Sequence, residues 1–96
     1  MSPIRKKKLE VIRKKLDKLD NSLLSVIKKR TLLVNEVVKL KKFKKEIVDK
    51  KRIRVILTKI RKKSIQKKID PKITNRIWKN MIWSYINYER KNFNKK

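Results

Sequence analysis

The stretch VIRKKLDKLDNSLLSVIKKRTLLVNEVVKLKK, from Val11 to Lys42, decides the fold of this chain. Apolar residues recur along it in alternating steps of three and four, in a series that begins just before it. The members of the series are Leu9, Ile12, Leu16, Leu19, Leu23, Val26, Leu33, Val37 and Leu40. This spacing is a heptad seam, which predicts one long helix with a single apolar stripe.

The seam also predicts that the long helix has a partner. Ser2 and Pro3 are typical of a helix start, because Ser caps free backbone N–H groups and Pro fits the first turn. A helix from about Pro3 to Lys41 would be ~55 Å long. A compact chain of this size has a radius of gyration of only ~13 Å. We therefore expect a second surface to cover the stripe.

Two further periodic stretches predict two shorter helices, and so an all-α chain with one domain over residues 1–96. The first carries Ile53, Ile56, Leu57 and Ile60. The second follows Asp70-Pro71, a cap residue and a first-turn Pro, and carries Ile73, Ile77, Trp78, Met81, Ile82, Tyr85, Ile86 and Phe93. The break between the first two helices, within 42–48, contains neither Gly nor Pro and is poorly marked.

The composition excludes several kinds of chemistry. The chain has no Cys and no His, which excludes disulfides, thiolate metal sites and His-based triads. Eight scattered carboxylates are a poor set of metal ligands, so we expect no metal and no cofactor. No stretch has the ~20 apolar residues of a membrane span, and the basic N-terminus lacks the apolar run of a secretory signal. The expected location is the cytoplasm.

The net charge of +25 has two explanations. A strongly basic chain usually binds nucleic acid or an anionic surface. Lys, Ile and Asn also have A/T-rich codons, whereas the absent Gly and Ala have G/C-rich ones, so drift of a genome toward A+T would produce the same composition. We favour drift, and the sequence leaves open whether the charge has a function.

One residue interrupts the heptad seam. Arg30 lies where an apolar residue belongs, and a guanidinium in a packed seam is costly unless an anion meets it. That anion is either a carboxylate of the chain or a ligand. Lys41, eleven residues later, returns to nearly the same helix face. Arg13 lies ~25 Å before Arg30 on the same helix, so one small ligand could contact both only if they come from two chains.

Other polar residues also stand out from a plain bundle. Asp49 and Arg52 share a helix face, and without a ligand they would form a local surface pair that contributes little stability. Glu89 falls on the apolar stripe of the third helix, where a nearby cation would stabilise it. The four Trp and Tyr residues at helical spacing are more often core than base-stacking platforms. They are Trp78, Trp83, Tyr85 and Tyr88.

The order of these residues resembles that of a known family. The opening stretch contains an Arg, a Leu-Asp pair, a Leu-Leu pair, a second Arg and then a Lys, as in the long first helix of the all-helical chorismate mutases. Asp49-Lys-Lys-Arg52 is similar to the Asp-x-x-Arg that opens the second helix of the family. Ile69-Asp70 and Tyr88-Glu89 are similar to parts of its third. The resemblance covers roughly Leu9 to Phe93.

The resemblance implies an intertwined homodimer of three-helix chains with two shared active sites. In it, Arg30 and the Arg13 of the partner chain would bind the two carboxylates of chorismate, and Lys41 would hydrogen-bond the ether oxygen of the breaking bond. Asp49 and Arg52 would shape the site near the ring hydroxyl and the carboxylates. Conversion of chorismate to prephenate needs no nucleophile, base or metal, so fixed cations can catalyse it.

The chain departs from the family pattern at four places. Ile53 stands where Glu is frequent, Glu89 where Gln is frequent, and Tyr85 where a small polar residue is common. The connection between Lys41 and Arg52 is one residue short. Glu89 can donate to the ether oxygen only when it is protonated, which predicts activity that rises as the pH falls. Glu89 and Tyr85 are therefore also expected in the site.

Three other functions compete with the mutase. Isochorismate-pyruvate lyases share the fold and the Arg/Lys frame, and Ile53 and Tyr85 favour them slightly, whereas Asp49 favours the mutase. A basic helical dimer that binds nucleic acid would explain the charge but not Arg30. A coiled-coil scaffold would explain the heptads but neither Arg30 nor Glu89. We expect a small-molecule substrate, with no membrane and no nucleic acid as partner. The sequence does not reveal the catalytic rate or whether the enzyme is regulated by feedback.

Overall fold

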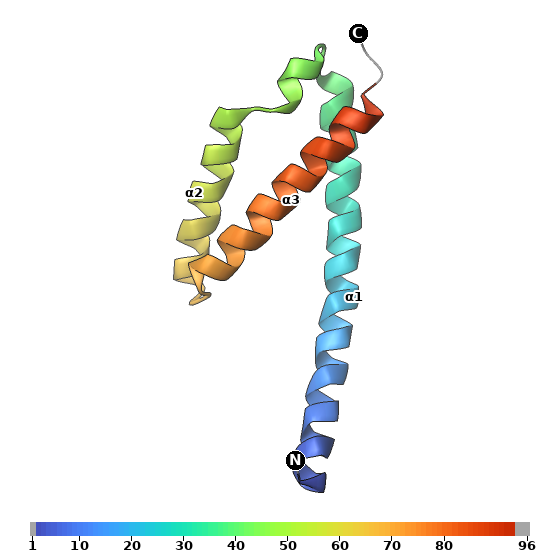
Figure 1. Ribbon diagram of the computed structural model, residues 1–96, viewed down its shortest axis with the longest axis vertical. Coiled ribbons are helices and arrows are strands. Elements are labelled where there is room, and N and C mark those ends of the chain that lie inside the picture. Colours follow the sequence, from blue (N-terminus) through green and yellow to red (C-terminus); the bar gives the residue numbers. More distant parts are fainter. Residues whose placement is uncertain (1, 94–96) are drawn as a thin grey trace. The chain divides into compact units, whose positions relative to one another are not determined.

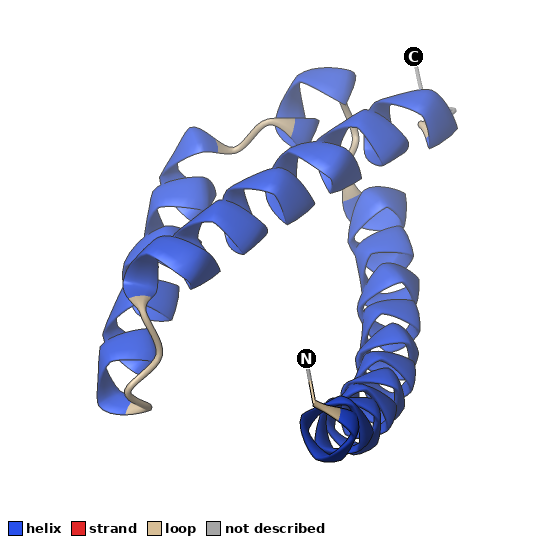
Figure 2. Ribbon diagram, turned by 60° about the horizontal axis from the view of Figure 1, so that its bottom comes forward, coloured by secondary structure: helices blue, strands red, loops and turns tan. Residues whose placement is uncertain are grey.

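The computed structural model describes residues 2–93, and the regular secondary structure within them is all helical (Figure 1). Three α-helices follow in order: α1 (Pro3–Leu40), α2 (Lys50–Gln66) and α3 (Pro71–Asn92), with a short 3-10 helix, η1 (Lys44–Ile47), between α1 and α2. Figure 2 shows only helices and their connecting loops in this part of the chain. The predicted all-α class and the three helices are confirmed. No helix within residues 2–93 is long and apolar enough to cross a membrane.

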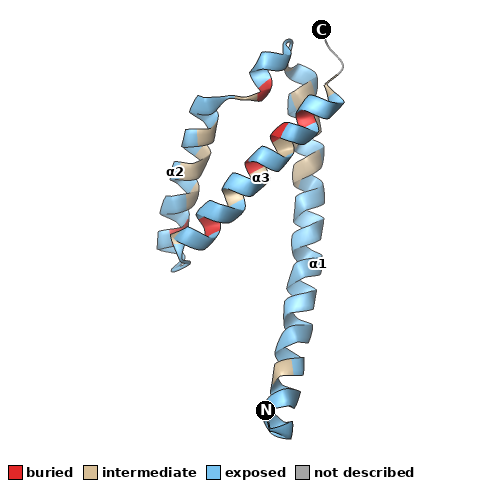
Figure 3. Cartoon of the chain, viewed as in Figure 1, coloured by how far each residue is buried: buried red, intermediate tan, exposed pale blue. Residues whose placement is uncertain are grey.

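The described residues divide after Val34 into two units, and the first consists of the N-terminal part of α1. Ser2 caps the helix as predicted, because its Oγ accepts a hydrogen bond from the backbone N of Arg5 at 3.3 Å. No residue of α1 is buried (Figure 3). Leu19 and Leu23, two members of the heptad seam, are 65% and 56% exposed. The stripe that defines the helix is therefore uncovered in the single chain.

The second unit begins at Asn35, and its first feature is the break between α1 and α2. The carboxylate of Glu46 accepts hydrogen bonds from the backbone N of Lys42 at 2.8 Å and of Phe43 at 3.5 Å. These two N–H groups lie between the end of α1 and the start of η1, and Glu46 accepts from them in the manner of a capping box. A side chain from the next turn therefore supports the break that Gly or Pro would otherwise mark.

α2 and α3 form a helical hairpin and pack against each other (Figure 1). Asp49 caps α2 by accepting from the backbone N of Arg52 at 3.0 Å. Asp70 caps α3 by accepting from the backbone N of Lys72 at 2.9 Å, and Pro71 is the first helical residue, as predicted. Lys68 lies in the turn between the helices and has a positive φ of 59°, a conformation in which Gly is the usual residue.

The core of the second unit is small. Ile47 of η1 and Ile82 and Ile86 of α3 are buried, and five half-buried side chains pack against them. These five are Val48, Ile53, Ile56, Leu57 and Phe93. Near the other end of the hairpin, the hydroxyls of Ser64 and Thr74 form a buried hydrogen bond of 2.7 Å.

Several aliphatic and aromatic residues of α3 lie outside this core. Ile73 and Ile77 of α3, which were predicted to lie on its apolar stripe, are 56% and 52% exposed. Trp78 and Tyr85 are half-buried, whereas Trp83 and Tyr88 are exposed, so the expectation that aromatics form the core holds only in part. Burying exposed apolar surface is worth about 25 cal/mol per Å². The hairpin therefore also has apolar surface for a further partner to cover.

Candidate active site

An ion pair between Lys41 and Glu89 joins the two ends of the second unit. Lys41 is the first residue after α1, and Glu89 lies near the end of α3. The Nζ of Lys41 donates to the Oε1 of Glu89 at 3.2 Å. Only 7% of Glu89 is exposed, and Lys41 is half-buried. A buried acid therefore meets a cation, as expected for an acid on an apolar stripe.

The pair offers two hydrogen-bond donors of different kinds. The Lys41 ammonium carries a positive charge and donates hydrogen bonds. Glu89 accepts as a carboxylate and donates only when it holds a proton. Both groups are fixed in a place with little access for water, where charge stabilisation is stronger than in bulk solvent. Such an arrangement suits the stabilisation of negative charge that grows on an oxygen during a reaction.

Asp49 and Arg52 lie at the start of α2 and are both exposed. The contact between them joins the Asp49 carboxylate to the backbone N of Arg52, so Asp49 has a role in starting the helix. That role accounts for an acid at this position without any ligand. The expected contribution of the two side chains to a substrate site remains a prediction.

Tyr85 and Ile53 are the other two side chains that depart from the family pattern, and both are half-buried. Tyr85 lies one helical turn before Glu89 on α3. Its ring meets that of Tyr88 edge to face, with 6.5 Å between the ring centroids. Ile53 packs against the buried core. An apolar side chain in this place supplies no hydrogen bond to a substrate hydroxyl.

Arg13 and Arg30 lie on the part of α1 that belongs to the first unit. Arg13 is exposed and Arg30 is half-buried. They are seventeen positions apart in one continuous helix, so the ~25 Å separation expected from the sequence holds. Their roles toward a ligand, and their meeting with Lys41, remain predictions.

Sequence reasoning missed Glu46, whose carboxylate holds the turn directly after Lys41. The available signal was an acidic residue three positions after the residue that begins a turn, the spacing of a capping box. No group of three or more His, Cys, Asp or Glu side chains within residues 2–93 is placed to hold a metal ion.

Comparison with known proteins identifies the family. Residues 12–90 match the family "Chorismate mutase type II", so the match spans both units and includes every candidate residue above. No curated protein and no solved structure matches the chain significantly. The family catalyses the rearrangement of chorismate to prephenate, an isomerase reaction. The chain belongs to the chorismate mutase type II family and is an enzyme of the isomerase class.

Proposed function

We propose that this chain is a cytoplasmic, homodimeric chorismate mutase that supplies prephenate for phenylalanine and tyrosine biosynthesis. The observation that carries the proposal is the buried Lys41–Glu89 pair, which joins two residues 48 positions apart in the sequence. These are the two positions at which the family resemblance expects donors to the ether oxygen. A scaffold or a nucleic-acid-binding helix pair does not require an ion pair in a small apolar core, where the loss of solvation is costly.

The proposed mechanism needs only positioning and charge. In the substrate, the ether C–O bond breaks while a new C–C bond forms within the same molecule, and no atom enters or leaves. Arg30 and the Arg13 of a second copy bind the two carboxylates and hold the compact conformer. Lys41 and protonated Glu89 donate to the ether oxygen, where negative charge grows in the transition state.

The uncovered stripe of α1 supports the homodimer. Seam residues such as Leu16, Leu19, Leu23 and Leu33 are each more than half exposed. A second copy of α1 or of the helical hairpin would bury them, and apolar burial is the main force in permanent association. On α3, the exposed Ile73 and Ile77 line an open hollow of about 520 Å³ together with Lys72, Arg76 and Asn80. A helix from a second chain could fill it.

The experiment that tests the function is product identification. The purified protein is incubated with chorismate, and we expect prephenate as the product. Arg30→Ala should lower kcat/KM about a hundredfold, equivalent to roughly 2.7 kcal/mol of transition-state stabilisation. Arg61→Ala, which removes an exposed guanidinium of α2, is the matched control and should leave kcat/KM within about twofold. A folded dimer that does not turn over chorismate would refute the proposal.

Ile53 favours a second candidate, an isochorismate-pyruvate lyase. It packs against the core at a position where the mutases often place a Glu that contacts the substrate hydroxyl. Without that Glu, the site is less selective for the position of the hydroxyl on the ring. Incubation with isochorismate distinguishes the two candidates, because the lyase releases pyruvate and salicylate whereas the mutase forms no pyruvate.

A further inference from the structure

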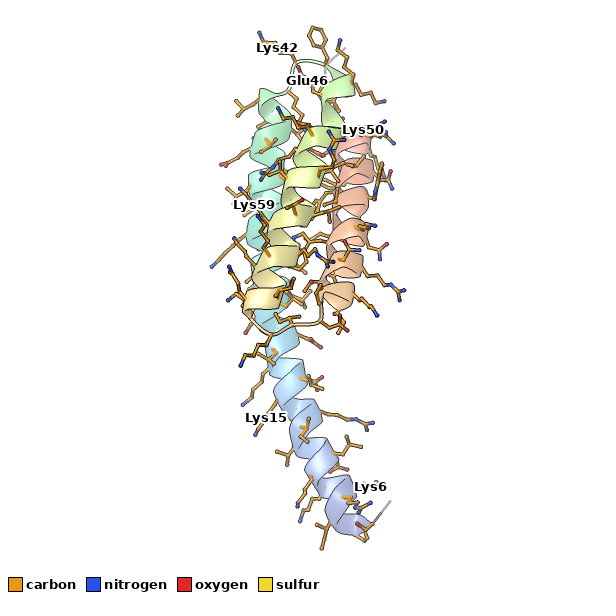
Figure 4. The ribbon with its side chains drawn as sticks, turned by 90° about the vertical axis from the view of Figure 1, so that its left-hand side faces the viewer. Lys6, Lys15, Lys42, Glu46, Lys50 and Lys59 are labelled. Atoms are coloured by element: carbon orange, nitrogen blue, oxygen red, sulfur yellow. The ribbon has the colours of Figure 1, made fainter. Side chains whose placement is uncertain are left out.

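Glu46 lies at the turn that carries Lys41 out of α1. Figure 4 shows Lys42 and Glu46 at this turn. The backbone N of Lys41 still bonds to the carbonyl of Val38 at 3.2 Å, so Lys41 is the last residue held by the helix. The next N–H group, that of Lys42, donates to Glu46 Oε2 at 2.8 Å. The backbone N–H of Lys41 is therefore bonded within α1, and the backbone N–H of the next residue is bonded to the Glu46 carboxylate.

The residue that follows Glu46 in the chain packs against α3. Ile47, the next residue, is 3% exposed and packs in the core with Ile82 and Ile86. Glu89 lies three residues after Ile86 on the same helix, so the core that holds η1 also holds the acid of the ion pair. Glu46 is the only carboxylate between Glu36 and Asp49 in the sequence. It therefore links the backbone beside Lys41 to the helix that carries its partner.

We propose that Glu46 is a positioning residue that holds the Lys41 ammonium against Glu89. The carboxylate fixes the direction in which the chain leaves α1, and this direction sets where the Lys41 side chain starts. Without the two bonds to Glu46, the turn can rotate about the backbone of Lys42 and Phe43, and the ammonium loses its fixed place. Its effect on catalysis rests on the proposed function, whereas its effect on the ion pair does not.

Asp70 provides a matched control for Glu46. Both are carboxylates of the second unit that accept a backbone N–H at nearly the same distance, 2.9 Å for Asp70 and 2.8 Å for Glu46. Asp70 begins α3, eighteen residues before Tyr88 and nineteen before Glu89, so it supports a helix end remote from the ion pair. Asp70→Ala should therefore lose a comparable cap without moving Lys41.

The first test measures the ion pair without any substrate. A double-mutant cycle of Lys41→Met and Glu89→Gln, read by urea unfolding at one protein concentration, gives the coupling between the two side chains. We expect this coupling to fall by more than half in the Glu46→Ala background and to stay unchanged in the Asp70→Ala background. An unchanged coupling in Glu46→Ala would overturn the proposal, whether or not the protein acts on chorismate.

The second test measures catalysis. Glu46→Ala should lower kcat about tenfold with KM within about twofold, because Lys41 acts on charge that exists only in the transition state. Glu46→Gln keeps an oxygen that accepts from Lys42 and should restore most of the rate. Adding Glu46→Ala to Lys41→Ala should cause no further loss. Additive losses, or an equal loss in Asp70→Ala, would show a general effect of stability and overturn the positioning role.

The two tests separate the two hypotheses. If the unmutated protein turns over neither chorismate nor isochorismate, the proposed function fails, and the unfolding cycle still decides whether Glu46 positions Lys41. If chorismate is converted and the coupling does not depend on Glu46, the function stands and the positioning role is refuted.

Discussion

At the scale of single residues, Glu89 makes the clearest prediction, because a carboxyl group changes from acceptor to donor when it binds a proton. As a carboxylate it accepts from Lys41 at 3.2 Å and would repel a developing oxyanion. Because only the protonated acid donates to the ether oxygen, we expect the mutase rate to be higher at pH 5 than at pH 7.5. The measurement is kcat/KM across this range, with folding checked by circular dichroism at each pH.

Glu89→Gln is the informative variant for this prediction. The Gln amide donates a hydrogen bond at every pH, so the profile should become flat and the rate at pH 7.5 should rise. A flat profile in the unmutated enzyme would contradict the assigned role of Glu89. A profile that keeps its slope in Glu89→Gln would assign the pH dependence to another group.

The residues of the site were predictable to different degrees. Lys41 and Glu89 were expected from their order in the family, and the structure brings them together. Glu46 was not expected, because its importance comes from a bond to the backbone of another residue and not from its own place in a pattern. Asp49 was expected as a site residue, and the structure gives it a capping role that a sequence pattern does not distinguish from binding.

At the scale of secondary-structure elements, the turn between α2 and α3 contains a conformational strain that can be relieved. Lys68 has a φ of 59°, and a side chain in this region costs about 1 kcal/mol relative to Gly. Part of this gain is offset by the freedom that Gly adds to the unfolded chain, so Lys68→Gly should raise the free energy of unfolding by less than about 1 kcal/mol, measured by urea denaturation.

Lys67→Gly is the control for this turn. Lys67 has a φ of −87°, which costs a side chain nothing, and Gly there only adds freedom to the unfolded chain. Lys67→Gly should lower the stability or leave it unchanged. Equal effects of the two substitutions would mean that removal of a positive charge, and not backbone strain, determines the result.

Element boundaries were predictable where a side chain caps its own helix. Ser2 with Pro3 and Asp70 with Pro71 are local signals, and both mark a helix start in the structure. The end of α1 was poorly marked because Glu46, four residues beyond Lys42, supplies the bond. A turn that is stabilised by a residue of the next helix does not need a Gly or Pro at the break, so the sequence does not mark its position.

At the scale of the whole molecule, the uncovered stripe of α1 predicts the oligomeric state. We expect sedimentation equilibrium to give twice the 11.7 kDa mass of one chain. Leu23→Glu places a charge in the seam and should shift the protein to monomers or unfold it. Asn21→Glu adds the same charge outside the seam and should leave the dimer intact. A monomer in the unmutated protein would contradict the shared active site.

The sequence alone could not give the arrangement of two chains. The heptad seam predicts that α1 has a partner but not which surface covers it, because many apolar surfaces fit the same spacing. The charge is similarly uninformative. Glu46, Asp49, Asp70 and Glu89 each bond to a backbone N–H or to Lys41, so these acids serve the fold of the second unit and do not balance the many exposed lysines.

The uncovered α1 also has a consequence for how the protein reaches its native state. Within the second unit, α2 and α3 are adjacent in the sequence and pack against each other, so this hairpin can form quickly and within one chain. In the proposed homodimer, the stripe of α1 is covered only after an encounter with a second copy. Refolding should then have a slow phase whose rate grows with protein concentration, and newly made chains would mature faster in cells that produce more of them.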